Sequence, residues 1–513
     1  MNEHHQAALA GLVECYWKSN DVRLGEAMER LLSINASHSR AHRVMIHRAL
    51  EMRETDEAHT LIEKMLAINP KHTQVLGYLA ATHFLEDDTT GSEAAVQKAL
   101  KVNPKASSVY RILGEVASRH YRFSEGVAFQ EKALGLNEED HRARELYALD
   151  LLRLGREEEA RRELDRVFKA NPYSVLSYNL LEMMDTLAAF ATVTREEVVL
   201  KMPHSEEAVM ADAMVDLLEV AIVHFEEKYR VGLTKPILVE LFEEHDDFMV
   251  RSVGLPGNAG HLGICFGRLI TMDAPSVRPR GSSNWRSVLW HEFVHVVTLQ
   301  KTNNRMPRWL SEGISVYEEG VYAPAFHNRF DRAFIPILES EGRPKVADLD
   351  RLFTHTPSGT HLMLGYFMAG EFVQFYVDSY GFDALLAALD SIGAKTETIT
   401  ALSASATLSP LALTIAFDAY LAERLAVLGN PVAEVVLEAV EGSLEWVEAM
   451  ENVMASAPAE LDAAEALLAH YLEQEDWVNV LRVSDWALGI DPYDPALHRA
   501  VLSALMAQGS HDA

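Results

Sequence analysis

Two histidines and a glutamate lie close together in the stretch His291-Glu292-Phe293-Val294-His295. On a helix, residues four positions apart lie one turn apart on the same face, so both imidazoles can bind one metal ion. Glu292 lies about 100° around the helix from His291, where its carboxylate can act on a water molecule without binding the metal. This combination predicts metal-assisted hydrolysis, and an enzyme is the first hypothesis.

The segment around the motif has the pattern of a helix over Trp285–Leu299, with no Gly or Pro inside it. Its apolar residues recur at helical spacing: Val288, Leu289, Val296 and Leu299. Asn284 is a suitable N-cap. If this helix is buried, two histidines and a glutamate facing inward need a metal to satisfy them. The alternative is a pair of surface histidines on an ordinary amphipathic helix.

A third ligand follows from helix geometry at Glu312, 17 positions after His295. From His295 to Gln300 a helix advances about 7.5 Å. Lys301–Arg305 is a polar reversal, and Pro307 suits the first turn of a second helix. Climbing from Pro307 to Glu312 recovers a similar length and returns the carboxylate to the level of the histidines. The alternative for Glu312 is a carboxylate favoured by the dipole at a helix N-terminus.

Further along the second helix, Glu318 and Glu319 lie nearly two turns beyond Glu312, too far to bind the metal directly. Glu319 shares the face of Glu312, and Ser315 lies on the same side. Either side chain can hold a metal ligand in orientation.

The motif and the segment Pro307-Arg308-Trp309-Leu310-Ser311-Glu312-Gly313 together resemble the glutamate-zincin metallopeptidases of the peptidase MA group. In that family the segment after the active helix typically has the sequence Trp-Leu-x-Glu-Gly. The resemblance covers about residues 190–425, with its diagnostic part at 285–319. It implies one zinc ion per chain, held by His291, His295 and Glu312. It also implies that Glu292 polarises the attacking water.

Family members also place a tyrosine or histidine on a later helix to stabilise the oxyanion. Tyr366, within Leu364–Phe372, occupies the corresponding region. The alternative is a tyrosine packed in the core with its hydroxyl satisfied. Other candidates for this role are Tyr317, His327 and His361.

A small sheet is expected before the metal-binding helix. The strand candidates are rich in β-formers and bounded by Gly or Pro: Val198–Lys201, Lys235–Phe242 and Ile264–Met272. A strand edge there could take an extended peptide by main-chain pairing. The loop 257–263 is either a mobile wall of the cleft or a hairpin turn, and we favour the turn.

A repeat of 34 residues occupies the N-terminal part of the chain. Five consecutive units carry asparagine at the same position: Asn35, Asn69, Asn103, Asn137 and Asn171. Pro follows Asn in three of them. This pattern is typical of tetratricopeptide (TPR) repeats, pairs of helices that stack into a solenoid with a concave face. We expect Asn to adopt the left-handed turn that stops one helix, and Pro to start the next.

The C-terminal hundred residues predict one further helix pair over about 467–492 and a last helix from Ala496. Composition narrows the function classes. A net charge of −30 argues against nucleic acid or an anionic membrane as partner, because phosphate contacts need Lys and Arg. Cys15 and Cys265 fall in different domains, so no disulfide framework is expected.

No stretch reaches the roughly 18 apolar residues of a membrane span. The N-terminal residues lack the basic and apolar regions of a signal peptide. We therefore expect a cytoplasmic protein. The chain starts directly on a repeat, which leaves open whether further sequence precedes it.

Together these patterns predict a mainly α protein in three parts. A TPR α-solenoid spans 1–180, an α+β zincin-like peptidase MA domain spans 185–428, and a helical, TPR-like tail spans 429–513. The predicted function is zinc-dependent hydrolysis of peptide or protein substrates, with a protein partner on the concave TPR face. The alternative is a non-catalytic TPR scaffold with a vestigial or structural metal domain. The intact Glu292 favours the enzyme, because a structural site needs the two histidines but not the base.

Overall fold

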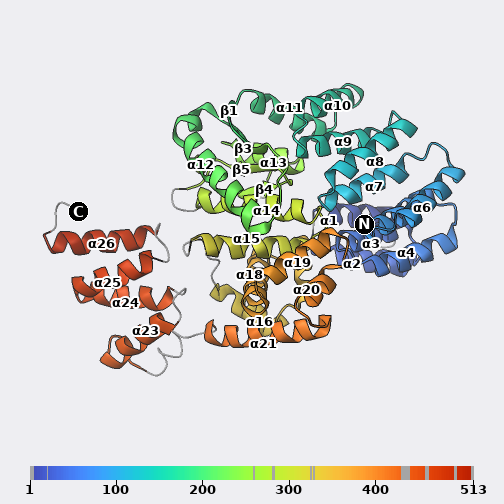
Figure 1. The fold of residues 1–513 in the computed structure, drawn as a ribbon. Helices are drawn as coiled ribbons and strands as arrows, with labels where there is room; N and C mark the ends of the chain where they lie inside the picture. Colours follow the sequence, from blue (N-terminus) through green and yellow to red (C-terminus); the bar gives the residue numbers. More distant parts are fainter. Residues whose placement is uncertain are drawn as a thin grey trace.

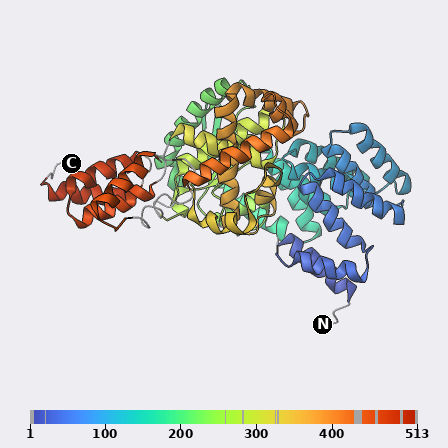
Figure 2. The ribbon, with the colours of Figure 1, turned by 90° about the horizontal axis from the view of Figure 1, so that it is seen from below.

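A computed structural model describes residues 5–19, 21–257, 260–279, 283–323, 326, 330–428, 439–456, 461–489 and 494–509. The protein is mainly α-helical with one small sheet, as predicted, and has helical repeats at its N-terminus and an α+β middle region. Figure 1 shows the helical repeats on one side of the middle region and the C-terminal helices on the other. Figure 2 shows the same order from below.

The N-terminal helices form antiparallel pairs, each burying an apolar face against its neighbours, as Leu61, Ile62 and Met65 do in the second pair. These helices are α1 (Gln6–Lys18), α2 (Leu24–Ile34), α3 (Ser39–Glu51), α4 (Thr55–Ile68), α5 (Thr73–Leu85), α6 (Thr89–Val102), α7 (Ser108–Arg119), α8 (Phe123–Leu136), α9 (His141–Arg153), α10 (Glu157–Ala170) and α11 (Val175–Ala188).

The five repeat asparagines follow the second helix of each pair, but not in the conformation expected. Their φ angles lie between −149° and −138°, so the prediction of a left-handed turn at these positions was wrong. Each side-chain oxygen instead accepts a hydrogen bond from the backbone two residues later, as Asn69 does from Lys71 at 3.0 Å. This Asx turn uses extended backbone. The prolines lie within the turn, and α5 begins only at Thr73, so they do not start the next helix.

The left-handed residues occupy the other turn, between the first and second helix of a pair. They are also spaced by 34 positions: Arg53 (φ 56°), Asp87 (φ 56°), Tyr121 (φ 60°) and Gly155 (φ 72°). The chain reverses sharply at each of them, because a single left-handed residue stops the first helix.

These turns contact the middle region. Asp87 accepts hydrogen bonds from Arg305 at 3.0 and 3.1 Å. Gly155 lies so close to the strand Ile237–Phe242 that an added Cβ would be 2.5 Å from Cδ1 of Leu238. Glu54, which follows the left-handed residue Arg53, binds Arg351 at 2.7 Å. The row of turns is therefore the edge along which the repeats dock.

The sheet has five strands in the order β1-β2-β3-β5-β4, with the outer pairs antiparallel and the inner pairs parallel. The strands are β1 (Ala191–Arg195), β2 (Val198–Met202), β3 (Ile237–Phe242), β4 (Gly263–Cys265) and β5 (Leu269–Asp273). The segments predicted for β2 and β3 are strands, whereas β1 was not predicted.

The prediction of one strand over Ile264–Met272 was wrong, because this segment forms a hairpin. Gly267 has φ 94°, and the backbone of Phe266 donates to the carbonyl of Leu269 at 2.7 Å, which folds β4 back onto β5. The loop 257–263 is thus not a hairpin turn. It leads into β4, and its residues Asn258 and Ala259 lie outside the described part of the chain.

The helices of the middle region pack against the sheet and against one another. Most of them surround one large core, which includes Phe225, Phe293, Ile314 and Phe372. These helices are α12 (His204–Tyr229), α13 (His245–Val253), α14 (Trp285–Lys301), α15 (Arg308–Tyr322), α16 (Ile335–Glu341), α17 (Leu349–Thr354), α18 (Gly359–Tyr380), α19 (Phe382–Gly393), α20 (Thr398–Ser405) and α21 (Pro410–Leu428). Among the described residues, no single helix has the length and apolar composition needed to cross a membrane. One pair, Thr398–Ser405 with Pro410–Leu425, passes that test only jointly, across a bend of 79°.

The C-terminal helices have a core of their own, centred on Trp446, Leu467 and Val480. They are α23 (Leu444–Ser456), α24 (Asp462–Glu473), α25 (Trp477–Leu488) and α26 (Pro495–Ala507). Glu475 has φ 52° between α24 and α25, the same left-handed turn that closes the first helix in the N-terminal pairs.

Gly313 sets the distance between α15 and α18. A Cβ at this position would lie 2.4 Å from the carbonyl oxygen of Ala369, whereas a Cβ at Gly11 of α1 would meet nothing within 4 Å. Gly313→Ala should lower the free energy of unfolding by about 1–3 kcal/mol or more through overpacking. Gly11→Ala should leave it unchanged or raise it by up to about 1 kcal/mol through helix propensity. Urea unfolding of both variants checks this, and equal stabilities would contradict the assigned close approach.

Candidate metal and catalytic site

The two histidines lie on α14, which begins as predicted at the Asn284 N-cap, where the Asn284 side chain accepts a hydrogen bond from the Arg286 backbone at 3.1 Å. The chain then reverses through two consecutive left-handed residues, Asn303 (φ 50°) and Asn304 (φ 56°). α15 runs back along α14, as the pairing of Ser287 with Glu319 and of His295 with Ser311 shows. The reversal therefore returns Glu312 to the histidines.

Three side chains converge on one point between the helices. One carboxylate oxygen of Glu312 lies 3.2 Å from Nε2 of His291 and 3.2 Å from Nε2 of His295. One ligand atom from each of the three residues lies within 4.8 Å of the other two, a separation that a single metal ion can bridge. Two imidazoles and one carboxylate are the donor set of a catalytic zinc with an open position, so the residues present fit that ion.

The carboxylates around the two histidines favour a positive charge at this point. Burial works against ionisation of His291, but Glu319, Glu312 and Glu292 outweigh it and raise its pKa well above the usual value. Burial also opposes ionisation of Glu312, yet His295, His291 and Arg308 hold the pKa of that carboxyl well below its usual range. Several carboxylates around two imidazoles thus attract positive charge, which a bound divalent ion would supply.

The ligand side chains are oriented by other groups of α14 and α15. The second nitrogen of His295, Nδ1, contacts the Ser311 hydroxyl at 2.7 Å and that of Ser315 at 3.4 Å. Nδ1 of His291 lies 3.2 Å from Glu319, which also accepts a hydrogen bond from Ser287. Both groups expected to orient ligands, Ser315 and Glu319, contact the histidines. Such contacts set the tautomer and direction of a metal-binding imidazole.

Glu292 is 7% exposed and lies against β4, one of the two edge strands of the sheet. A Cβ on Gly263 would be 2.7 Å from Cγ and 2.9 Å from Oε1 of Glu292, so only glycine leaves room for this carboxylate beside the strand. Burial raises the pKa of Glu292. A carboxylate with a raised pKa next to the ligand cluster is suited to accept and return a proton near neutral pH.

Of the residues considered for the oxyanion role, the structure brings Tyr366 of α18 to the site. Its ring centroid lies 6.2 Å from that of His291, and it lines the same cavity as Glu292 and Glu312. Tyr317 instead packs under Lys228, and His361 contacts Ser358 and Glu341, so neither lines this cavity. His327 lies outside the described residues.

The ligand cluster opens into a cavity of about 680 Å³, whose far wall is made by the helical repeats. Tyr121, the left-handed residue of the fourth repeat turn, lines it together with Glu292 and Tyr366. The adjacent ring of Phe123 packs edge-on against Phe266 of the β4–β5 hairpin, with centroids 5.8 Å apart. Residues more than 150 positions apart therefore surround one cavity.

Sequence reasoning missed four of these contributors. Arg308 donates to Glu312 at 3.1 Å, and Ser311 contacts His295; both were detectable because they share a helix face with Glu312 or Ser315. Gly263 and Tyr121 carry no comparable signal, since their positions depend on how separate elements pack.

A second group with ligand-like spacing, His59, His83 and Glu86, lies on the surface of the repeats. Glu86 is exposed and contacts His59 at 3.0 Å.

Comparison with protein families matches residues 219–416 to the model of the Peptidase MA superfamily. The matched segment contains the ligand cluster, Glu292 and Tyr366. Comparison with curated proteins gave no significant match.

Ser311→Ala removes the 2.7 Å contact that orients His295 without touching a ligand atom. We expect its affinity for Zn²⁺ to fall by about 10- to 100-fold. Competition with a chromophoric chelator measures this directly. Ser340→Ala, at an exposed serine of the same region, is the control. An affinity equal to wild type in Ser311→Ala would show that His295 is oriented by other contacts.

Proposed function

We propose that this protein is a zinc-dependent metallopeptidase. The observation that carries the proposal is the convergence of His291, His295 and Glu312 on one point, with the buried carboxylate of Glu292 beside it. The match of residues 219–416 to the Peptidase MA superfamily supports peptidase chemistry at this place in the chain.

His291, His295 and Glu312 would hold the metal. Zinc bound there would supply Lewis-acid chemistry, polarising a carbonyl and lowering the pKa of a water molecule towards 7. Ser311, Ser315 and Glu319 keep the two imidazoles directed at the ion, and Arg308 directs the carboxylate of Glu312.

Glu292 is the proposed general base. Its carboxylate accepts a proton from the attacking water and returns it to the leaving amine, so the same group serves both halves of the reaction. Gly263 permits the close approach of Glu292 to β4. The outer edge of β4 borders the cavity and offers main-chain groups to an extended peptide, which would lie across Glu292.

Tyr366 is the proposed oxyanion donor. Burial, together with the charge of Glu312, raises the pKa of Tyr366 far above its ordinary value, so its hydroxyl keeps its proton and can donate a hydrogen bond. The second candidate function is a non-catalytic scaffold that uses the concave face of the repeats to bind a protein. Glu292 favours the peptidase, because a structural metal site has no use for a buried base beside the ligands.

The first test is metal content. Purified protein should contain about one zinc per chain, and His291→Ala and His295→Ala should each abolish it. The double variant His59→Ala/His83→Ala should keep the zinc, since that surface group lies outside the proposed site. Plasma emission spectroscopy gives the stoichiometry, and full zinc occupancy in both His291→Ala and His295→Ala would refute the ligand assignment.

The second test concerns the base. Glu292→Gln should retain zinc and fold while kcat/KM for peptide cleavage falls by at least about 10²-fold, because the proton acceptor is lost. Glu339→Gln, an exposed glutamate of α16, should have wild-type activity. Rates are measured with a library of quenched fluorescent peptides. A Glu292→Gln variant as active as wild type would place the chemistry elsewhere.

A further inference from the structure

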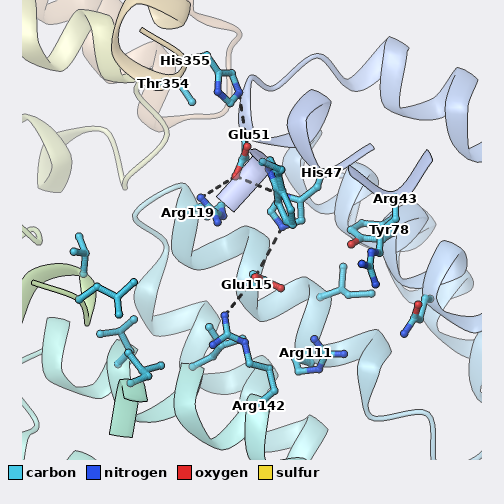
Figure 3. A pocket seen from close by; sticks show the side chains of 18 residues that line it. Arg43, His47, Glu51, Tyr78, Arg111, Glu115, Arg119, Arg142, Thr354 and His355 are labelled. Atoms are coloured by element: carbon cyan, nitrogen blue, oxygen red, sulfur yellow. Dashed lines mark ion pairs between the residues drawn. The ribbon is translucent and has the colours of Figure 1, made fainter. Parts of the chain in front are cut away.

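A second cavity, of about 790 Å³, lies on the inner face of the helical repeats. Its walls come from the first helices of successive pairs, with His47 and Glu51 on α3, Arg111, Glu115 and Arg119 on α7, and Arg142 on α9. The end of α17 closes it at Thr354 and His355. Figure 3 shows Glu51 between Arg119, His47 and His355, and Glu115 between His47 and Arg142.

This cavity adjoins the one at the ligand cluster. Glu51, Glu115, Arg119 and Arg142 line both of them, as do the apolar side chains Leu146, Leu149, Val253 and Leu255. A ligand can therefore extend from the inner face of the repeats to Glu292 while it stays within the two adjoining cavities. We call the two cavities together the chamber.

The charge of the chamber is opposite to that of the chain. The whole sequence has 76 Asp and Glu against 46 Lys and Arg. Apart from Arg308 and the two acids at the ligand cluster, Glu292 and Glu312, only three carboxylates of the described residues line the chamber, those of Glu51, Glu115 and Asp350. They face six guanidinium groups, on Arg43, Arg53, Arg111, Arg119, Arg142 and Arg153. Among the described residues, no lysine lines either cavity.

The arginines are more accessible than the acids with which they pair. The Arg119 and Arg142 side chains are 48% and 49% exposed, against 8% for Glu51 and 20% for Glu115. Arg142 lies 3.3 Å from Glu145 and 4.0 Å from Glu115, and Arg119 lies 2.8 Å from Glu51. A guanidinium has five donors and binds a carboxylate through two of them at once. Because both side chains are about half exposed, each can bind a further carboxylate from a ligand.

We propose that the chamber binds a peptide segment carrying acidic side chains, which Arg119 and Arg142 hold while the segment extends towards Glu292. This inference rests on the proposed peptidase function and adds the substrate class. The apolar residues shared by the two cavities accommodate neighbouring side chains, and the edge of β4 pairs with the backbone. The helical repeats thus form part of the substrate site.

Binding to the full chain tests the proposal without requiring turnover. The Glu292→Gln background prevents cleavage. The probes are two fluorescently labelled peptides of the same sequence, one with Asp and Glu and the other with Asn and Gln at those positions. Anisotropy should give at least about tenfold tighter binding of the acidic peptide, since each charge-assisted pair contributes about one order of magnitude.

Arg119→Gln/Arg142→Gln in the same background should reduce affinity for the acidic peptide by at least about tenfold and leave that for the neutral peptide within about twofold. Arg161→Gln/Arg166→Gln, which alters two arginines of α10 that line neither cavity, should change neither affinity. Circular dichroism and zinc content verify that the variants fold. If the double variant is unfolded, Arg142→Gln alone takes its place.

Equal affinity of the two peptides, or equal losses in the chamber and control variants, would overturn the proposal. Displacement of the acidic peptide by inorganic phosphate or a short oligonucleotide at lower concentration than by unlabelled peptide would do the same, because the chamber would then select phosphate. If acidic peptides bind as expected but no peptide is cleaved by wild-type protein, the binding site stands and the peptidase function fails.

Discussion

The contact of one carboxylate oxygen with two imidazoles is the constraint on which the middle region depends. Glu312 reaches His291 and His295 only because the chain reverses at Asn303 and Asn304 and α15 runs back along α14. Gly313 allows α15 to pack closely against α18, because a side chain at this position would clash with the backbone of Ala369. The resulting cluster of buried acids and imidazoles favours added positive charge, which a metal ion held by these residues would supply.

Docking of the repeats follows from a second regularity, the left-handed residue that closes the first helix of each pair. Because this turn recurs every 34 residues, the turns line up along one edge of the solenoid and present different side chains to the same neighbour. Asp87 binds Arg305 within the α14–α15 connection, and Gly155 lets the last pair approach β3. The same edge thus supports the reversal that positions Glu312 and places Tyr121 in the cavity.

The docked repeats form part of the wall of the cavity at the ligand cluster. Their concave face and the cleft of the α+β region share their lining, so arginines of α7 and α9 lie in the same walled space as Glu292. In a chain with net charge −30, acidic ligands are repelled from most of the surface. A lining rich in guanidinium groups would then favour acidic segments within the chamber. The helical repeats would then supply the residues that select the substrate, and the α+β region would supply the residues that cleave it.

The sequence by itself predicted the features that depend on residues close together in the chain. The spacing of His291, Glu292 and His295 on a helix, the return of Glu312, and the 34-residue repeat all follow from helical periodicity, which sequence carries directly. The predictions at the Gly267 hairpin and at the repeat asparagines were wrong, because residue type alone did not distinguish one turn geometry from another. Gly263 beside Glu292, Tyr121 in the cavity and the arginines of the chamber were decided by tertiary structure. They lie far apart along the chain, and only the packing of the repeats against the α+β region brings them together.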